Sequence, residues 1–353
     1  MSRRSWLVCA SMVLLIGCSR PVTPLPDAPW PSPTPAPSVV LPRDAGPHDA
    51  LTEWWYYTGH LHADDGRTYG FEFTLFQVRR QDAPTGYLGH FAISDIDGRH
   101  FSHQAAFSQM EARSGFPLGV QDWTLDEQGG VDLISATMRP GPGADPPYSL
   151  RLQLVDTKPP ALHHGGYIDY GPAGGSYYYS RTRLDVRGEL SGGDGLPRPV
   201  VGLAWMDHQW GDFIVARGGW DWYSVQLDDR TELMLYVLRD PSGQTSQVYG
   251  SLVQPDGRVR EVEPGTVHAE ATGHWTSPHT GATYPSGWRL TLPDGRVLVL
   301  TPQLEDQELY FPRPRTEDQA PTVSGPAYWE GAVSVRGDTT GVGYVELTGY
   351  ADQ

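Results

Sequence analysis

Cysteine is almost absent from this chain. Its 353 residues include two cysteines, Cys9 and Cys18, which both stand near the N-terminus. No disulfide can join distant parts of such a chain, so a folded domain has to be stabilised by its buried core.

Two hydrolase signatures are also missing. The sequence has no Gly-x-Ser-x-Gly nucleophile elbow and no His-Glu-x-x-His zinc motif. A Ser-His-Asp triad assembled from distant residues stays open, because triads are recognised by geometry rather than by spacing. Hydrolase chemistry therefore has weak support in the sequence.

Basic residues are few. Lys and Arg total 26 against 42 Asp and Glu, which gives a formal net charge of -16. Loss of residues 1–17 would remove two arginines and bring the charge from -16 to about -18. We expect no nucleic-acid partner, since nothing would offset the repulsion from phosphates.

The N-terminus has the order of a bacterial secretion signal. Arg3 and Arg4 precede an apolar run, residues 6–16, that is too short to span a membrane as a mature helix. The run ends in Leu-Ile-Gly-Cys at residues 15–18, which resembles the lipobox of bacterial lipoproteins. This resemblance implies a signal peptide at 1–17, lipidation of Cys18 and, with Ser19 next in the chain, an anchor in the outer membrane facing the periplasm.

Proline dominates the next segment. Ten prolines lie between Pro21 and Pro47, with few large apolar residues. Such a stretch cannot bury a core, so we expect residues 18–47 to be an extended tether.

The remainder of the chain favours β-structure. Alternating apolar positions recur, as in residues 71–77 and 150–155, and Asp-Gly turns stand at 97–98, 256–257 and 294–295. A strand, acidic turn and strand at residues 55–79 are echoed at 222–239, and the pattern of 179–205 recurs at 329–346. We predict an all-β protein with two similar barrels, spanning residues 48–211 and 212–353.

The segment from Gly202 to Gly211 concentrates polar and aromatic groups at the end of a strand-like run. In a regular strand His208 and Trp210 share one face, while Trp205 and Asp207 share the other. Asp207 and His208 therefore need a bulge or a strand end to act together. The structural alternative is a buried His-Asp pair that only fixes the end of a strand.

Several motifs together resemble the AttH family of secreted lipocalin-like proteins, which also includes carotenoid 1,2-hydratases. The resemblance spans residues 49–352 and is carried by Glu-Trp-Trp-Tyr-Tyr at 53–57, Gly-Phe-Glu-Phe-Thr-Leu-Phe-Gln at 70–77, Gly-His-Phe-Ala-Ile-Ser-Asp at 89–95, Tyr-Tyr-Tyr-Ser at 177–180, Trp-Met-Asp-His-Gln-Trp-Gly at 205–211, Gly-Trp-Asp-Trp at 219–222, Trp-Glu-Gly-Ala-Val at 329–333 and Gly-Tyr-Val-Glu-Leu-Thr-Gly-Tyr at 343–350. It implies two tandem lipocalin-like β-barrels packed together, with a hydrophobic ligand site and no cofactor.

The hydratase branch implies a particular set of catalytic residues. Its His-x-Trp pair corresponds to His208 and Trp210, and its Tyr to Tyr236. Its Asp does not transfer, because Leu238 stands where it is expected; this leaves Asp207 or Asp221 as the acid. Adding water to an isoprenoid double bond needs an acid, a base that orients water and aromatic faces that stabilise a carbocation.

Further candidates would line the ligand site. The tryptophans could form a stacking wall, although large aromatics also plug the ends of barrels. Glu72 and His90 could face the cavity or could serve as hydrogen-bonded structural groups. The predicted ligand-binding residues are Trp54, Trp55, Glu72, Phe76, Gln77, His90, Trp205 and Trp222. We predict no metal site, since His60 and His62 lack a third ligand at a recognisable spacing, and we place His163 and His164 in a loop.

Two classes of function follow. The protein is either a cofactor-free enzyme of hydratase type acting on an apolar substrate, or a binder that carries an apolar molecule or lipid, with an export system as a possible partner. We expect the cavity near the contact between the barrels, on the face of His208 and Trp210. His208 should then lie near a carboxylate from Asp207, Asp221 or Glu72.

Overall fold

The computed structural model describes residues 39–80, 83–140, 146–192, 194–213, 218–311 and 327–351. The expected signal peptide, the expected lipidation site Cys18 and the expected tether up to residue 38 lie outside these ranges. No helix of the described residues is long and apolar enough to cross a membrane.

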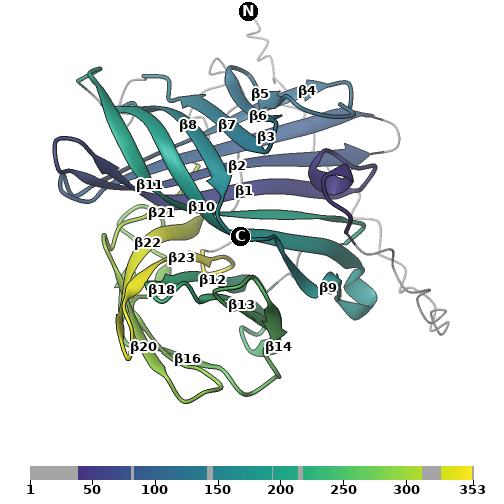
Figure 1. Cartoon of the computed structure of the whole chain (residues 1–353), viewed down its shortest axis with the longest axis vertical. Helices are drawn as coiled ribbons and strands as arrows, with labels where there is room; N and C mark the ends of the chain where they lie inside the picture. Colours follow the sequence, from purple (N-terminus) through teal and green to yellow (C-terminus); the bar gives the residue numbers. More distant parts are fainter. Residues whose placement is uncertain are drawn as a thin grey trace, which may run out of the picture. The chain divides into compact units, whose positions relative to one another are not determined.

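The first sheet has eleven antiparallel strands (Figure 1). They are β1 (Thr52–Ala63), β2 (Thr68–Arg80), β3 (Ala83–Asp95), β4 (His100–Met110), β5 (Leu118–Val120), β6 (Trp123–Gln128), β7 (Val131–Thr137), β8 (Ser149–Asp156), β9 (Ala161–Asp169), β10 (Gly175–Ser191) and β11 (Pro197–Gly211). Their order is β4-β3-β2-β1-β11-β10-β8-β7-β6-β5, with β9 paired to β10. The edge strands β4 and β5 come into contact, so the sheet is nearly closed.

The second sheet has ten strands and repeats the pairing of first and last strands seen in the first sheet. Its strands are β12 (Trp220–Leu227), β13 (Glu232–Arg239), β14 (Thr245–Val253), β15 (Val259–Glu261), β16 (His268–Ala271), β19 (Trp288–Thr291), β20 (Val297–Pro302), β21 (Glu308–Leu309), β22 (Tyr328–Gly337) and β23 (Gly341–Leu347). The order is β15-β14-β13-β12-β23-β22-β20-β19-β16, and β21 pairs with β22. In both sheets the first strand pairs with the last, β1 with β11 and β12 with β23.

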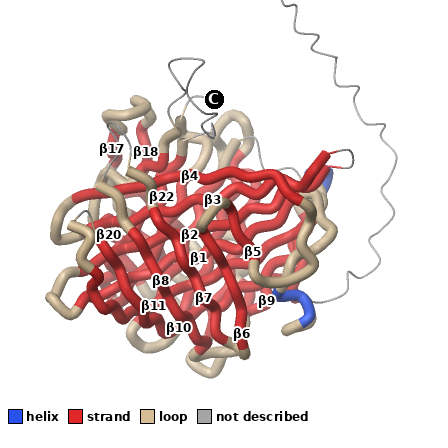
Figure 2. Tube along the Cα trace, turned by 90° about the horizontal axis from the view of Figure 1, so that it is seen from above, coloured by secondary structure: helices blue, strands red, loops and turns tan. Residues whose placement is uncertain are grey.

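Strands dominate the described residues as a whole (Figure 2). A small hairpin joins β17 (His274–Thr276) to β18 (Thr283–Pro285), and two single-turn 3-10 helices are η1 (Arg43–Ala45) and η2 (Gly171–Ala173). The structure confirms the predicted all-β class with two barrel domains.

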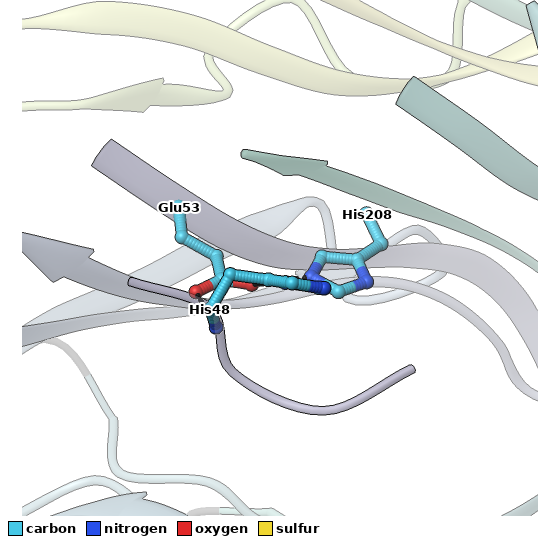
Figure 3. A group of neighbouring side chains, drawn as sticks. All are labelled: His48, Glu53 and His208. Atoms are coloured by element: carbon cyan, nitrogen blue, oxygen red, sulfur yellow. Dashed lines mark hydrogen bonds and ion pairs between the residues drawn. The ribbon is translucent and has the colours of Figure 1, made fainter. Parts of the chain in front are cut away.

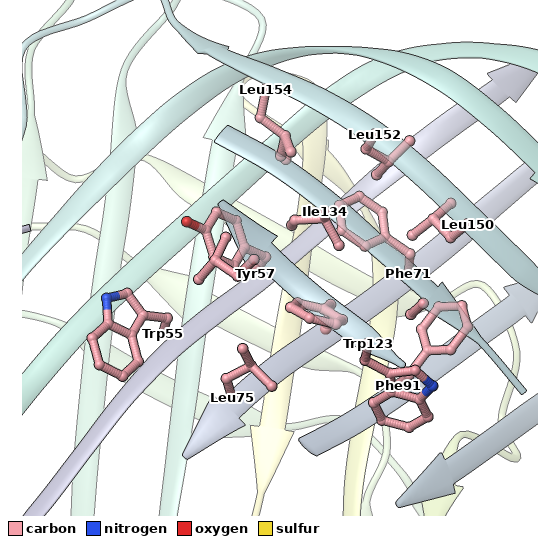
Figure 4. Close-up of a cluster of buried hydrophobic side chains, with 14 of the residues drawn as sticks. Trp55, Tyr57, Phe71, Leu75, Phe91, Trp123, Ile134, Leu150, Leu152 and Leu154 are labelled. Atoms are coloured by element: carbon pink, nitrogen blue, oxygen red, sulfur yellow. The ribbon is translucent and has the colours of Figure 1, made fainter. Parts of the chain in front are cut away.

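Alternation along the strands sends one set of side chains into the first barrel (Figure 4). Trp55, Tyr57, Phe71 and Phe73 are each at most 1% exposed and meet Trp123 and the leucines of β8. Burying a large apolar side chain contributes roughly 1.5–3 kcal/mol. This core stabilises the fold without a disulfide.

Residues 39–47, the last part of the expected tether, pack on the first barrel instead. Val39 is buried in its core, and the indole of Trp55 donates a hydrogen bond to the carbonyl oxygen of Ala45 at 3.0 Å. The high proline content gave no indication of this packing. One buried apolar side chain and a few backbone hydrogen bonds are enough to hold such a short segment on the barrel.

The two sheets also pack against each other through their outer faces. Tyr56, Tyr178 and Trp205 of the first sheet meet Trp222 and Met234 of the second in one buried cluster. The hydroxyl of Tyr56 donates to Glu330 at 2.7 Å, and the amide of Gln226 donates to the carbonyl oxygen of Ala204 at 2.9 Å. This contact between the sheets positions the candidate site.

Candidate functional site

Strand β11 keeps a regular register opposite β1 through the polar segment. Tyr56 stands opposite Asp207, Trp55 opposite His208 and Trp54 opposite Gln209, with no bulge. The side chains therefore alternate as the sequence predicts. Asp207 faces the second sheet, whereas His208 points into the first barrel, so the two do not act together.

His208 belongs to a buried cluster at the end of the first barrel (Figure 3). Its Nε2 lies 2.8 Å from an oxygen of Glu53, and Nδ1 of His48 lies 2.7 Å from the same oxygen. Trp55 stacks on His208 with ring centroids 4.7 Å apart, and Trp210 stacks on His48 at 4.0 Å. The expected acid partners Asp207, Asp221 and Glu72 are wrong, because all three lie outside the interior of this barrel.

Hydrogen bonds in this cluster favour the ionised form of Glu53. Burial alone would raise the pKa of Glu53, but the hydrogen bonds from His208 and His48 outweigh it and hold that pKa below its usual value. Burial lowers the pKa of His208, so a neutral ring is favoured. The sequence did not identify Glu53 as the partner of His208, because the two residues meet only through the pairing of β1 with β11.

Among the described residues, His48, Glu53 and His208 are the one group whose ligand atoms lie close enough to hold a metal, within 4.8 Å of one another. Hydrogen bonds already satisfy these atoms. Glu53 accepts further bonds from the backbone N–H of His48 at 2.8 Å and from the amide of Gln77 at 3.0 Å. In this structure the cluster forms a hydrogen-bonded support for the end of the barrel.

A cavity of about 130 Å³ opens between the two sheets, on the Asp207 face of β11. Most of its wall is aromatic, and two carboxyl groups face into it. The lining residues are Thr52, Trp54, Tyr56, Thr74, Phe76, Tyr178, Asp207, Gln209, Trp220, Trp222, Tyr236 and Glu346. The position between the barrels agrees with the expectation from the sequence, whereas the expected face, that of His208 and Trp210, is wrong.

Asp207 is held by three donors. The indole of Trp205 donates at 2.6 Å, the hydroxyl of Tyr178 at 2.5 Å, and Ser180 gives a third hydrogen bond. Burial nevertheless raises the pKa of Asp207 to about 6, with these hydrogen bonds acting in the opposite direction. The group therefore lies close to its titration point at neutral pH.

Glu346 has fewer donors than Asp207. The indole of Trp220 donates to it at 2.9 Å, and burial raises its pKa to about 7. Glu330, directly beyond the cavity wall, has its pKa raised well above the usual value by burial and by the neighbouring acids Glu346 and Glu72. Because like charges crowd this face, protonated carboxyl groups are favoured there.

The other predicted site residues fall into three groups. Trp54, Phe76, Trp222 and Tyr236 line the cavity. Trp55, Gln77 and Trp210 lie with His208 in the first barrel, on the opposite face of the same strands. Trp205, Glu72, His90 and Asp221 lie outside the cavity wall.

Each residue of the third group has a different partner. Trp205 supports Asp207, and Glu72 accepts a hydrogen bond from Thr74 between the sheets. His90 contacts the hydroxyl of Tyr328 at 2.6 Å. Asp221 pairs with Arg239 outside the cavity wall, so its expected role as a catalytic acid stays a prediction.

A larger cavity, of about 390 Å³, has a different character. Its wall carries charged groups such as Arg99, Glu305 and Asp306, and Asp306 lies 2.9 Å from His279. An apolar ligand would have to desolvate these groups, so the aromatic cavity suits such a ligand better.

Comparisons with known proteins agree with this architecture. A family model described as AttH-like matches residues 32–350. The crystal structure of an AttH candidate from Nitrosomonas europaea superimposes with a TM-score of 0.77 at 31% identity, over 90% of this chain and 99% of the other. The crystal structure of kievitone hydratase from Nectria haematococca shares the fold, with a TM-score of 0.66 at 14% identity over 88% and 93% of the two chains.

A curated relative points in the same direction. Kievitone hydratase of Fusarium solani subsp. phaseoli is 24% identical over 149 residues, 41% of this chain and 42% of that protein. The matched part thus spans less than half of the relative. Together with the fold, the matches over most of the chain show that this protein belongs to the AttH family and has its two lipocalin-like barrels.

Proposed function

We propose that this protein is a hydratase-type enzyme that adds water to a carbon–carbon double bond of an apolar, isoprenoid-like substrate. The observation that carries the proposal is the pair of carboxyl groups, Asp207 and Glu346, that titrate near neutral pH in an aromatic cavity. The relation to kievitone hydratases supports this reaction class. Hydration adds one water molecule to the substrate and needs no oxidant or reductant, so one general acid and one general base can perform it.

The two carboxyl groups suit different steps. Glu346 accepts a single hydrogen bond, and burial raises its pKa, so its protonated form is favoured and it suits the general acid. Asp207 has three donors that favour its ionised form, which suits a general base that takes a proton from water.

The wall of the cavity suits the intermediate. Protonation of an alkene leaves a carbocation, and an indole face stabilises a desolvated cation by about 2 kcal/mol. Trp54, Trp220 and Trp222 provide such groups beside the acids. The cavity is small beside a typical ligand site of about 300–1,000 Å³. It would hold the reacting end of a longer molecule, whose remainder would leave past the partly exposed Trp54 and Phe76.

A serine hydrolase is less well supported at this place. Ser180 and His163 do meet Asp207, but Ser180 lies between the other two. In a catalytic triad the histidine stands between the serine and the acid. Ser180 is also fully buried, so it is not accessible as a nucleophile.

Turnover by matched variants tests the proposal. Purified protein would be incubated with kievitone and with short isoprenoid alkenes, and hydrated products would be followed by mass spectrometry. We expect Asp207→Asn and Glu346→Gln each to lower turnover at least 100-fold, the scale of general acid-base catalysis. Asp306→Asn, in the charged cavity, should retain activity.

Two outcomes would contradict this assignment. Equal loss in Asp306→Asn would move the chemistry to the other cavity. Binding of an alkene by wild type without turnover would leave the alternative, a non-catalytic carrier of apolar molecules. We further propose that Cys18 anchors the protein to the outer membrane on its periplasmic side, where such substrates concentrate and where an export system could be a partner.

A further inference from the structure

His163 was expected in a loop, but it lies on strand β9 and is fully buried. Its Nε2 lies 2.6 Å from the hydroxyl oxygen of Ser180, which donates to Asp207. Its Nδ1 lies 2.9 Å from the hydroxyl oxygen of Ser251, which donates to Glu261 at 2.9 Å. An unbroken chain of hydrogen bonds thus runs from the cavity through both sheets.

The two ends of the chain differ in exposure. Asp207 is 4% exposed and faces the cavity. The side chain of Glu261 is 34% exposed and lies 3.5 Å from the exposed ring of His164. The ring of Tyr178 covers His163 at a centroid distance of 4.4 Å. The chain therefore connects a buried acid with a surface acid through a closed interior.

When both carboxyl groups are ionised, the chain has fewer bridging protons than hydrogen-bond contacts. Four contacts link the five groups, and each contact needs one bridging proton. The two serine hydroxyls supply two protons and a neutral imidazole supplies a third. With both carboxyl groups ionised, one contact lacks a proton, and a single added proton completes the chain.

We propose that this chain of hydrogen bonds is a proton relay between the cavity carboxyl of Asp207 and the surface carboxyl of Glu261. The inference rests on the proposed function, in which Asp207 takes a proton from water and must release it before the next turnover. Glu346, which gave its proton to the alkene, regains one from bulk water that enters the emptied cavity past the partly exposed Trp54 and Phe76. The relay gives that proton a path that avoids the substrate-filled cavity.

The transfer balances atom by atom. A protonated Asp207 passes its proton to the oxygen of Ser180, whose own proton moves to Nε2 of His163. The proton on Nδ1 of His163 moves to the oxygen of Ser251, whose own proton moves to Glu261. The result is an ionised Asp207, a protonated Glu261 that releases its proton to water, and His163 in the other tautomer.

Burial lowers the pKa of His163 to about 3, so the ring is neutral between transfers, as a relay with two tautomers needs. Other titratable groups surround Asp207 and His163. Those that face Asp207 are Tyr178 on β10, Tyr236 on β13, Glu330 on β22 and Glu346 on β23, and those that face His163 are Tyr178, His164 on β9 and Glu261 on β15.

The tautomer of His163 tests the relay without any substrate. Full-length protein with 15N-labelled histidine would be followed by NMR from pH 5 to pH 8. We expect the proton on Nε2 when Asp207 is ionised and on Nδ1 when Asp207 is protonated, so the signal should switch near pH 6. A tautomer that stays the same at every pH in wild type would show that His163 does not respond to Asp207, and it would overturn the proposal.

Variants locate the switch in the chain. Ser251→Ala removes the partner of Nδ1 and should abolish the switch, whereas Ser251→Thr should restore it. Ser102→Ala, a control that removes another buried hydroxyl with a single hydrogen bond, should leave the switch intact. A switch that persists in Ser251→Ala would overturn the proposal.

Activity then separates the relay from the proposed function. With an alkene that wild type hydrates, Ser251→Ala should lower kcat about tenfold at pH 7 and leave KM unchanged. A switching His163 in a protein that hydrates no alkene would refute the proposed function and leave the relay standing. Hydration of an alkene by a protein in which His163 keeps one tautomer would support the proposed function and refute the relay.

Discussion

Glu72 offers a test of the electrostatics between the sheets that needs no substrate. It is 1% exposed, and one of its oxygens has no hydrogen-bond partner among the described residues. Burial raises its pKa from 4.5 to about 8; the hydrogen bond from Thr74 opposes this, and the neighbouring Glu346 adds to it. At neutral pH the folded protein therefore keeps a proton on Glu72 that the unfolded chain has lost.

The sign and size of the effect follow from this difference. Because the folded state binds the extra proton, stability falls as the pH rises from the unfolded pKa of 4.5 towards the folded pKa of about 8. Each pH unit in this window costs about 1.4 kcal/mol. Glu72→Gln, which resembles the protonated acid in shape, lacks this loss. Its stability relative to wild type should thus increase by about 3 kcal/mol between pH 4.5 and pH 7.

Urea unfolding of both proteins across this pH range measures the difference. Glu270→Gln is the control, since it makes the same chemical change at a position that is exposed on β16. A difference between wild type and Glu72→Gln that does not change with pH would refute the account. It would mean that Glu72 is ionised at neutral pH and that the acids between the sheets do not favour protonated forms.

Three further predictions concern the site and the anchor. His208→Ala leaves Glu53 buried with one partner fewer, so the free energy of unfolding should fall by about 3 kcal/mol in urea titrations; an unchanged value would contradict the described cluster. Trp54→Ala, at a partly exposed wall position, should weaken binding of an apolar fluorescent probe about tenfold. Leu196→Ala, at an exposed position, should leave the binding unchanged. Equal binding by the two variants would show that the probe does not bind in this cavity. Cys18→Ala should lose the lipid and leave the membrane fraction, and normal acylation of this variant would refute the lipobox interpretation.

Local sequence patterns predicted the strands and their faces. Alternation placed Asp207 and His208 on opposite faces of β11, and the repeated segments predicted two barrels. These inferences succeeded because the side-chain period of a strand is fixed by local geometry.

Partners across strands and sheets were beyond the sequence. Glu53 reaches His208 through the register of β1 on β11, and Glu346 reaches the cavity through the pairing of β12 with β23. The sequence also gave no indication that Asp221 pairs with Arg239 of β13. His163, between prolines and glycines, gave no sign of its burial. A single sequence contains no information on these distant pairings.

The most direct test of the central claim is the isotopic composition of the product formed from an alkene in D₂O enriched in 18O. Hydration in the cavity predicts one non-exchangeable deuterium on carbon, delivered by Glu346, and one 18O on the neighbouring carbon, with both labels lost in Asp207→Asn and Glu346→Gln. A product with 18O but no new carbon–deuterium bond would indicate hydrolysis and would contradict the account.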